Sequence, residues 1–291
     1  MRKLSLALLT FVALSATSSA APVGAQNSPV STLGGEVSFD FKYLANNVAD
    51  DAIDVVTAPL HIGEAGPLLT SPRFYLVLAG AGALWGGSFA LDQTMKSHLR
   101  SMSSSDADLL QNTSYAGVGA ATALLYGYGL YRGDARARQY ALTAGEGAGI
   151  ASLLAIGIKA AFGRLRPSQT SSHTAFFHGG QSFVSGDVTP MFALAAGVSE
   201  YFNNEWYVAA PIYSLALADG FGRMGHNAHW FSDVVGAALL GVATTELFLY
   251  LHKRHAEEPD AFRIFALEPT AVNPRSSQAA LPIGVGLATS W

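Results

Sequence analysis

Residues 159–167 read KAAFGRLRP, residues 184–187 read VSGD, and residues 223–233 read RMGHNAHWFSD. The stretches hold cations at Lys159, Arg166 and Arg223, a Ser-Gly pair, and a histidine followed four residues later by an aspartate. Cations and backbone amides bind phosphate oxygens, and an imidazole oriented by a carboxylate is a nucleophile for phosphorus. Together the stretches predict a phosphate pocket with a histidine nucleophile.

The third stretch places His229 and Asp233 four residues apart at the start of a predicted helix. Residues with this spacing share one helix face, so the carboxylate can fix the imidazole tautomer and support its positive charge. The other ring nitrogen is then free to attack. Taken alone, the stretch is more typical of a helix N-terminus with satisfied polar residues.

The cations and the Ser-Gly pair supply the predicted anion contacts. Lys159 offers a point charge, and Arg166 and Arg223 offer bidentate forks for phosphoryl oxygens. We expect Arg164 at the rim of the pocket. Ser185 and Gly186 precede a predicted helix whose first N–H groups can bind an anion. The alternative is that Ser185 or Asp187 simply caps that helix.

The spacing resembles the type 2 phosphatidic acid phosphatase (PAP2) and vanadium haloperoxidase superfamily, whose motifs are KX6RP, PSGH and SRX5HX3D. The resemblance covers residues 74–254. Its first motif matches fully, and its third matches except for Gly222 in place of serine. It implies a helical bundle with the pocket between helix ends, a phosphohistidine intermediate at His229, and no metal or other cofactor.

The middle motif departs from the family, because Asp187 stands where the family has a histidine that protonates the leaving alcohol. We interpret Asp187 as the catalytic acid in its place, although a carboxyl group releases its proton at lower pH than an imidazole does. His173, His178 and His226 are the nearby alternatives.

Composition favours a membrane-associated protein of the cell envelope. Charged residues make up 13% of the chain, against about 25% in soluble domains. The net charge of −4 gives no indication of nucleic-acid binding, and the lack of cysteine excludes disulfides and thiolate metal sites. Arg2 and Lys3 precede an apolar run and small residues, which predicts a signal peptide over residues 1–25, with an uncleaved membrane anchor as the alternative.

The rest of the chain divides into three predicted parts: residues 26–70 with an amphipathic helix at 45–56, a helical phosphatase domain at 71–255, and a tail at 256–291. The fold class is all-α, a six-helix bundle embedded partly or wholly in the membrane. The tail is predicted to form a short β-hairpin from residues 261–271 and 280–291. The six apolar segments are residues 74–91, 115–131, 140–162, 188–202, 206–221 and 234–251.

Two topology signals conflict if all six segments span. A cleaved signal peptide leaves the mature N-terminus outside, which would place Arg166 in the cytoplasm. The loop with Arg132, Arg136 and Arg138 instead indicates a cytoplasmic position before the third segment, which places Arg166 outside. We favour an inner-membrane protein with a periplasm-facing site, with a soluble or peripheral periplasmic protein as the alternative.

The predicted function is metal-independent hydrolysis of phosphomonoesters or diphosphates, with phosphorylated lipids or small phosphomonoesters as substrates and membrane lipids as partners. One alternative is a catalytically impaired member that binds anionic lipids, suggested by Asp187. Another is a vanadate-dependent haloperoxidase, which the short chain and the missing histidine disfavour.

Overall fold

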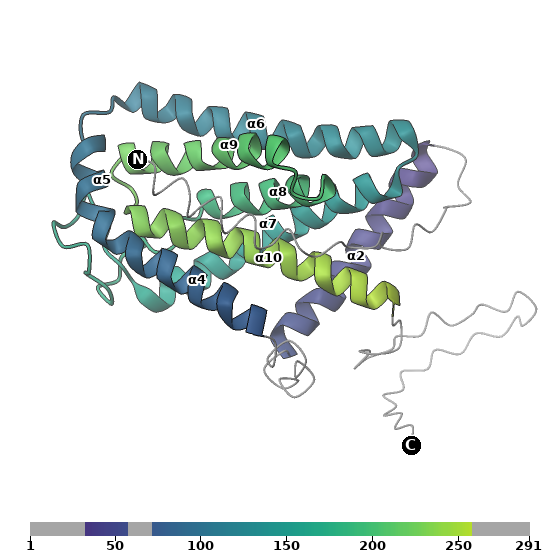
Figure 1. Ribbon diagram of the computed structural model, residues 1–291, viewed down its shortest axis with the longest axis horizontal. Helices are drawn as coiled ribbons and strands as arrows, with labels where there is room; N and C mark the ends of the chain where they lie inside the picture. The colour runs from purple at the N-terminus through teal and green to yellow at the C-terminus, as the bar shows by residue number, and fades with distance from the viewer. Residues whose placement is uncertain (1–32, 58–71, 258–291) are drawn as a thin grey trace, which may run out of the picture.

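The computed structural model describes residues 33–57 and 72–257, which form helices joined by loops, with no strand among them (Figure 1). The all-α prediction is therefore confirmed for these residues. The signal peptide and the predicted C-terminal hairpin lie outside them. In chain order the elements are α2 (Leu33–Thr57), α4 (Pro72–Ser88), the 3-10 helix η2 (Phe89–Leu91), α5 (Asp92–Leu99), α6 (Ser104–Arg132), α7 (Ala135–Phe162), α8 (Val188–Tyr201), α9 (Trp206–Gly225) and α10 (Phe231–Glu257).

The predicted count of six helices is not confirmed, and the helices differ from the predicted segments most in the N-terminal half of the chain. The segment at 74–91 becomes α4 and η2 and leads directly into α5, which was not predicted. Helix α5 has the polar sequence DQTMKSHL, so apolar periodicity does not reveal it. Helix α6 starts well before residue 115, and the amphipathic segment at 45–56 is part of the longer α2.

Local signals explain the ends of α6 and α7. The side chains of Ser103 and Asp134 accept hydrogen bonds from backbone N–H groups in the first turns of these helices. Gly133 and Gly163 end them in the left-handed conformation, with φ of 65° and 49°. These are the usual N-cap and C-cap residues. The cap at Gly163 turns the chain into the loop that carries Arg164 and Arg166.

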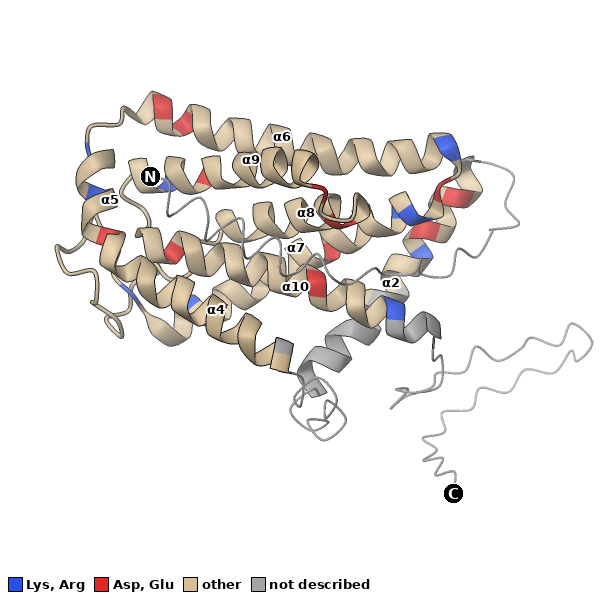
Figure 2. Ribbon diagram, viewed as in Figure 1, with Lys and Arg blue, Asp and Glu red and all other residues tan. Residues whose placement is uncertain are grey.

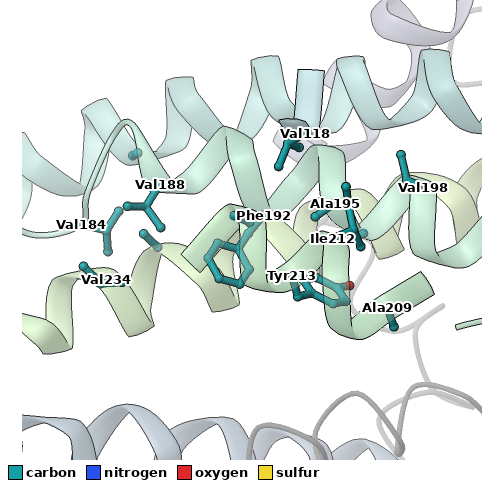
Figure 3. Packing of buried hydrophobic residues seen from close by; sticks show 14 of the residues in the cluster. Val118, Val184, Val188, Phe192, Ala195, Val198, Ala209, Ile212, Tyr213 and Val234 are labelled. Carbon is teal, nitrogen blue, oxygen red and sulfur yellow. The ribbon is translucent and has the colours of Figure 1, made fainter. Parts of the chain in front are cut away.

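Helix α8 lies inside the bundle and packs against α6, α7, α9 and α10 (Figure 1). A Cβ atom on Gly241 of α10 would lie 2.3 Å from the carbonyl oxygen of Thr189, so only glycine permits this approach. The core runs from Phe192 and Tyr213, whose rings stack at 5.9 Å, to Val188 and Val234 (Figure 3). This end of the core lies beside the predicted motifs and supports them.

The outer surface has features of a membrane protein. Within residues 33–57 and 72–257, three helical stretches are long and apolar enough to cross a membrane: Phe74–Leu99, Ala135–Phe162 and Phe231–Lys253. Only 6% of the apolar window in the first is buried, so its side chains face outward. Helix α6 carries charges only near its two ends (Figure 2). Large exposed apolar surfaces of this kind mark contact with lipid or protein.

Candidate active site

His229 lies in the short loop before α10 and is 1% exposed. Its Nδ1 atom is 2.7 Å from the carbonyl oxygen of Ser182. A carbonyl only accepts hydrogen bonds, so Nδ1 carries the proton and Nε2 keeps a free lone pair. Nε2 is buried and has no hydrogen-bond partner within residues 33–57 and 72–257. The geometry leaves one nitrogen available for a ligand or a reaction.

Electrostatics keep this ring neutral. Burial lowers the pKa of His229, and the charges of Arg223 and Lys159 lower it further, while Asp233 opposes them. The usual pKa of histidine is about 6.5, so a lowered value leaves the imidazole uncharged at neutral pH. Only the uncharged ring can act as a nucleophile.

Asp233 lies in the first turn of α10, and its Oδ2 is 3.7 Å from His229 Nδ1. The spacing argument thus brought the two side chains together, but the partner of Nδ1 differs from the prediction. The carbonyl of Ser182 fixes the tautomer, while Asp233 accepts hydrogen bonds from the Ser182 hydroxyl and the Trp230 backbone N–H. Asp233 therefore acts on the ring by charge and by holding Ser182.

The predicted cations converge on the same place from different elements. Lys159 lies in the last turn of α7, and a Cβ atom on Gly186 would lie 2.9 Å from its Nζ, so the two residues are adjacent. Arg223 lies in the last turn of α9, with Nε 3.1 Å from Asp187 Oδ2. Arg166 is near enough for its charge to act on Lys159.

Ser185 is fully buried, and its hydroxyl has no hydrogen-bond partner among the described residues. Its backbone N–H donates to the carbonyl oxygen of Asp233 at 3.3 Å, which places it beside the start of α10. Asp187 occupies the N-cap position of α8, but its side chain makes no capping hydrogen bond and pairs with Arg223 instead. Buried polar groups without partners are rare, so the Ser185 hydroxyl and His229 Nε2 mark a binding site.

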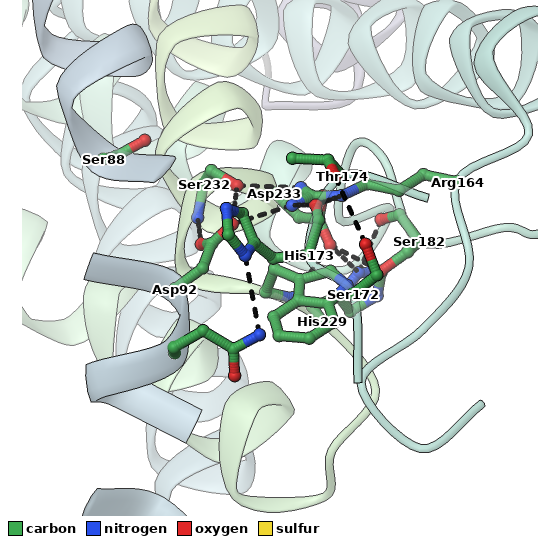
Figure 4. A network of polar contacts seen from close by, with 12 residues as sticks. Ser88, Asp92, Arg164, Ser172, His173, Thr174, Ser182, His229, Ser232 and Asp233 are labelled. Atoms are coloured by element: carbon green, nitrogen blue, oxygen red, sulfur yellow. Dashed lines mark hydrogen bonds and ion pairs between the residues drawn. The ribbon is translucent and has the colours of Figure 1, made fainter. Parts of the chain in front are cut away.

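The prediction that Arg164 lies at the rim of the pocket is wrong, because its side chain is 0% exposed. It donates to Asp233 Oδ1 at 2.5 Å, to Asp92 Oδ2 at 2.7 Å and to the Ser232 hydroxyl at 2.8 Å (Figure 4). Its guanidinium also faces aromatic rings, at 4.9 Å from Phe89. A buried cation that joins two buried carboxylates holds the start of α10 and thereby His229.

The family comparison agrees with this geometry. Residues 140–257, which contain all three motifs, match the model of the PAP2 superfamily. The resemblance predicted from the motifs is thereby confirmed.

A lipid A 1-phosphatase of Porphyromonas gingivalis is 32% identical to the chain over 106 residues. The match covers 36% of this chain and 22% of that protein, so the chain spans about a fifth of the relative's length. No solved structure matches the chain.

A residue outside the matched region completes the site. Asp92 of α5 is fully buried and accepts hydrogen bonds from the backbone N–H and hydroxyl of Ser232, both at 2.8 Å. Sequence analysis missed Asp92 and Ser182, since neither belongs to a motif. An aspartate directly after an apolar segment is a weak signal, and Arg164, the ion-pair partner of Asp92, is 72 residues away in sequence.

None of the three alternative histidines makes a side-chain hydrogen bond or ion pair with Asp187 or Arg223 among the described residues. His226 Nε2 is 2.9 Å from Asp108 of α6, and His173 Nδ1 is 3.5 Å from Gln93 of α5. His178 is exposed. No group of three or more His, Cys, Asp or Glu side chains within the described part of the chain is placed to hold a metal ion.

Proposed function

We propose that the chain is a phosphatase that hydrolyses phosphate esters of membrane lipids through a phosphohistidine at His229. The observation that supports this most directly is the state of the ring. Its Nδ1 is held by the Ser182 carbonyl, and its Nε2 is buried, unprotonated and without a partner in the described residues. Lys159 and Arg223 place positive charge around the same ring.

The proposed first step is attack of Nε2 on phosphorus. Lys159, Arg166 and Arg223 balance charge on the equatorial oxygens, where it matters most in the transition state. The Ser185 hydroxyl and the first N–H groups of α8 add hydrogen bonds. As the N–P bond forms, the ring becomes positive, and Asp233 at 3.7 Å stabilises it.

The bond from phosphorus to the leaving oxygen breaks, and that oxygen takes a proton from the Asp187 carboxyl. Water then attacks phosphorus, the N–P bond breaks, and Asp187 takes a proton from the water. In the structure Asp187 pairs with Arg223. A bound phosphate therefore competes with Asp187 for this arginine, and the displaced carboxylate takes up a proton from solvent, which it then gives to the leaving oxygen.

Lipid phosphates are the proposed substrate class for two reasons. The Phe74–Leu99 stretch turns an apolar surface outward, with Tyr75, Leu76 and Leu78 each more than half exposed. The similar Porphyromonas gingivalis protein is a lipid A 1-phosphatase. We place the site on the periplasmic face of the inner membrane because of the predicted signal peptide and the arginines around Arg136.

The test is phosphate release by the purified protein from p-nitrophenyl phosphate and from phosphatidate. We expect both to be cleaved, and we expect His229→Asn to reduce turnover by on the order of 10³-fold or more, as loss of a nucleophile does. His98→Asn removes an exposed histidine of α5 and serves as the matched control. Phosphate binding without turnover would indicate the impaired alternative, and vanadate-dependent bromide oxidation would indicate the haloperoxidase.

A further inference from the structure

Asp219 is a buried carboxyl group that the proposed reaction does not use. It lies on α9 and is 0% exposed. Its Oδ1 accepts a hydrogen bond from Gln111 Nε2 of α6 at 3.1 Å, while Oδ2 is buried and has no hydrogen-bond partner in the described parts of the chain. The helices pack closely here, because a Cβ atom on Gly222 would lie 2.6 Å from Gln111 Cγ. A lone buried carboxyl oxygen is costly and calls for an explanation.

Asp219 precedes Arg223 by four residues, so both lie on one face of α9. Arg223 already contacts one carboxylate, with Nε 3.1 Å from Asp187 Oδ2. The charge of Arg223 also acts on Asp219 and lowers its pKa. The guanidinium that the proposed mechanism assigns to the phosphate is therefore in contact with Asp187, and the charge of Asp219 acts on it from one helix turn away.

The protonation state of Asp219 changes near neutral pH. Burial raises the pKa of Asp219 to about 6, and the Asp187 carboxylate adds to this, against the effects of Gln111, Arg223 and Tyr115. Because Oδ1 accepts from the Gln111 amide, the proton of the neutral form resides on Oδ2. Asp219 is therefore neutral at pH values below its pKa and negatively charged at pH values above it.

We propose that Asp219 is a positioning residue that acts through Arg223. When neutral, it leaves the guanidinium to a bound phosphate group; when ionised, it competes with the phosphate for that guanidinium. The inference rests on the proposed phosphate pocket and adds to it a preference for acidic conditions that the three motifs do not encode.

Reciprocity gives a measurable consequence. If ionised Asp219 weakens anion binding, a bound anion must favour the neutral form by the same free energy. Anion binding near the pKa of Asp219 therefore takes up protons from solution. The other titratable or charged groups that face this region are Asp187, Arg223 and Tyr115, with His229 and Lys159 across the pocket.

The experiment is titration calorimetry of the purified full chain with sulfate, an anion that keeps its two charges from acid to neutral pH. Repeating the titration in buffers of different ionisation enthalpy gives the protons taken up per sulfate. For the native chain we expect uptake of up to about half a proton near pH 6, and an affinity that falls roughly five- to tenfold between pH 5 and pH 8.

Asp219→Asn keeps an acceptor for Gln111 and mimics the neutral carboxyl. We expect it to abolish the proton uptake near pH 6 and to flatten the affinity across this range. Asp108→Asn, which removes an exposed carboxylate of α6, should keep the native behaviour. Gln111→Met removes the hydrogen bond that lowers the pKa of Asp219, so its uptake maximum should move to higher pH. This variant also tests the idea if Asp219→Asn does not fold.

Unchanged proton uptake in Asp219→Asn, or an unshifted maximum in folded Gln111→Met, would overturn the proposal and assign the proton to His229. Sulfate that does not bind at any pH would overturn it as well. The result is independent of turnover, because calorimetry measures binding alone. An inactive chain that still shows Asp219-dependent proton uptake would contradict the phosphatase proposal and leave this inference standing.

Discussion

Replacing Arg164 by methionine tests whether this residue supports the structure of the site, in contrast to Arg166, which is proposed to bind the phosphate. Arg164 is fully buried between Asp92 and Asp233, at 2.7 and 2.5 Å. Its removal leaves two buried carboxylates without their cation. Breaking a buried ion pair in this way destabilises a protein by about 3–5 kcal/mol. For a domain of this size the melting temperature should fall by roughly 6–20 °C.

Arg166 provides the matched control, since it is two residues away and partly exposed. Arg166→Met removes a proposed phosphate contact and no buried pair, so we expect a melting temperature close to the native value and a large loss of phosphatase activity. Thermal unfolding of the detergent-solubilised variants, followed by circular dichroism, measures the contrast. Equal melting temperatures for Arg164→Met and the native chain would refute the assignment of Arg164 as the anchor of α10.

Three further predictions follow from the proposed chemistry and orientation. A cysteine at Ser168, which is exposed in the motif loop, should react with a membrane-impermeant thiol reagent in intact spheroplasts; labelling only after lysis would reverse the orientation. Activity should survive EDTA, because cations replace divalent metals here, and loss restored by Mg²⁺ or Zn²⁺ would contradict this. Asp187→Ala should slow the hydrolysis of alkyl phosphates by about 10²–10⁴-fold more than the hydrolysis of aryl phosphates, whose leaving groups need no proton. Equal effects on both substrates would exclude an acid role for Asp187 and turn attention to His173, His178 or His226.

Sequence spacing was sufficient for the residues that act by local geometry or belong to motifs. The interval between His229 and Asp233 brought the two side chains together beside the first turn of α10, and the motif order brought Lys159, Gly186 and Arg223 to one end of the bundle. A helix turn and a helix end impose the same local geometry in any context, so the spacing alone places these side chains near one another.

Sequence reasoning failed where a residue depends on distant partners. Arg164 and Arg166 look alike in a loop, yet only Arg164 is buried, because Asp92 of α5 and Asp233 of α10 meet it there. The role of the Ser182 carbonyl has no sequence signature at all, since every residue carries a carbonyl group. The polar helix α5 was missed for a related reason. Its contribution to the site is the position of Asp92, and an apolar pattern gives no indication of a polar helix.

The central claim is that His229 Nε2 forms a covalent bond to phosphorus. The direct measurement is to mix the protein with ³²P-labelled substrate, quench the reaction in a denaturant at alkaline pH, and locate the label by peptide mapping. We predict a base-stable, acid-labile phosphoryl group on His229 that is absent from His229→Asn. Native enzyme that turns over substrate while carrying no label on His229, or His229→Asn that keeps full activity, would contradict the account.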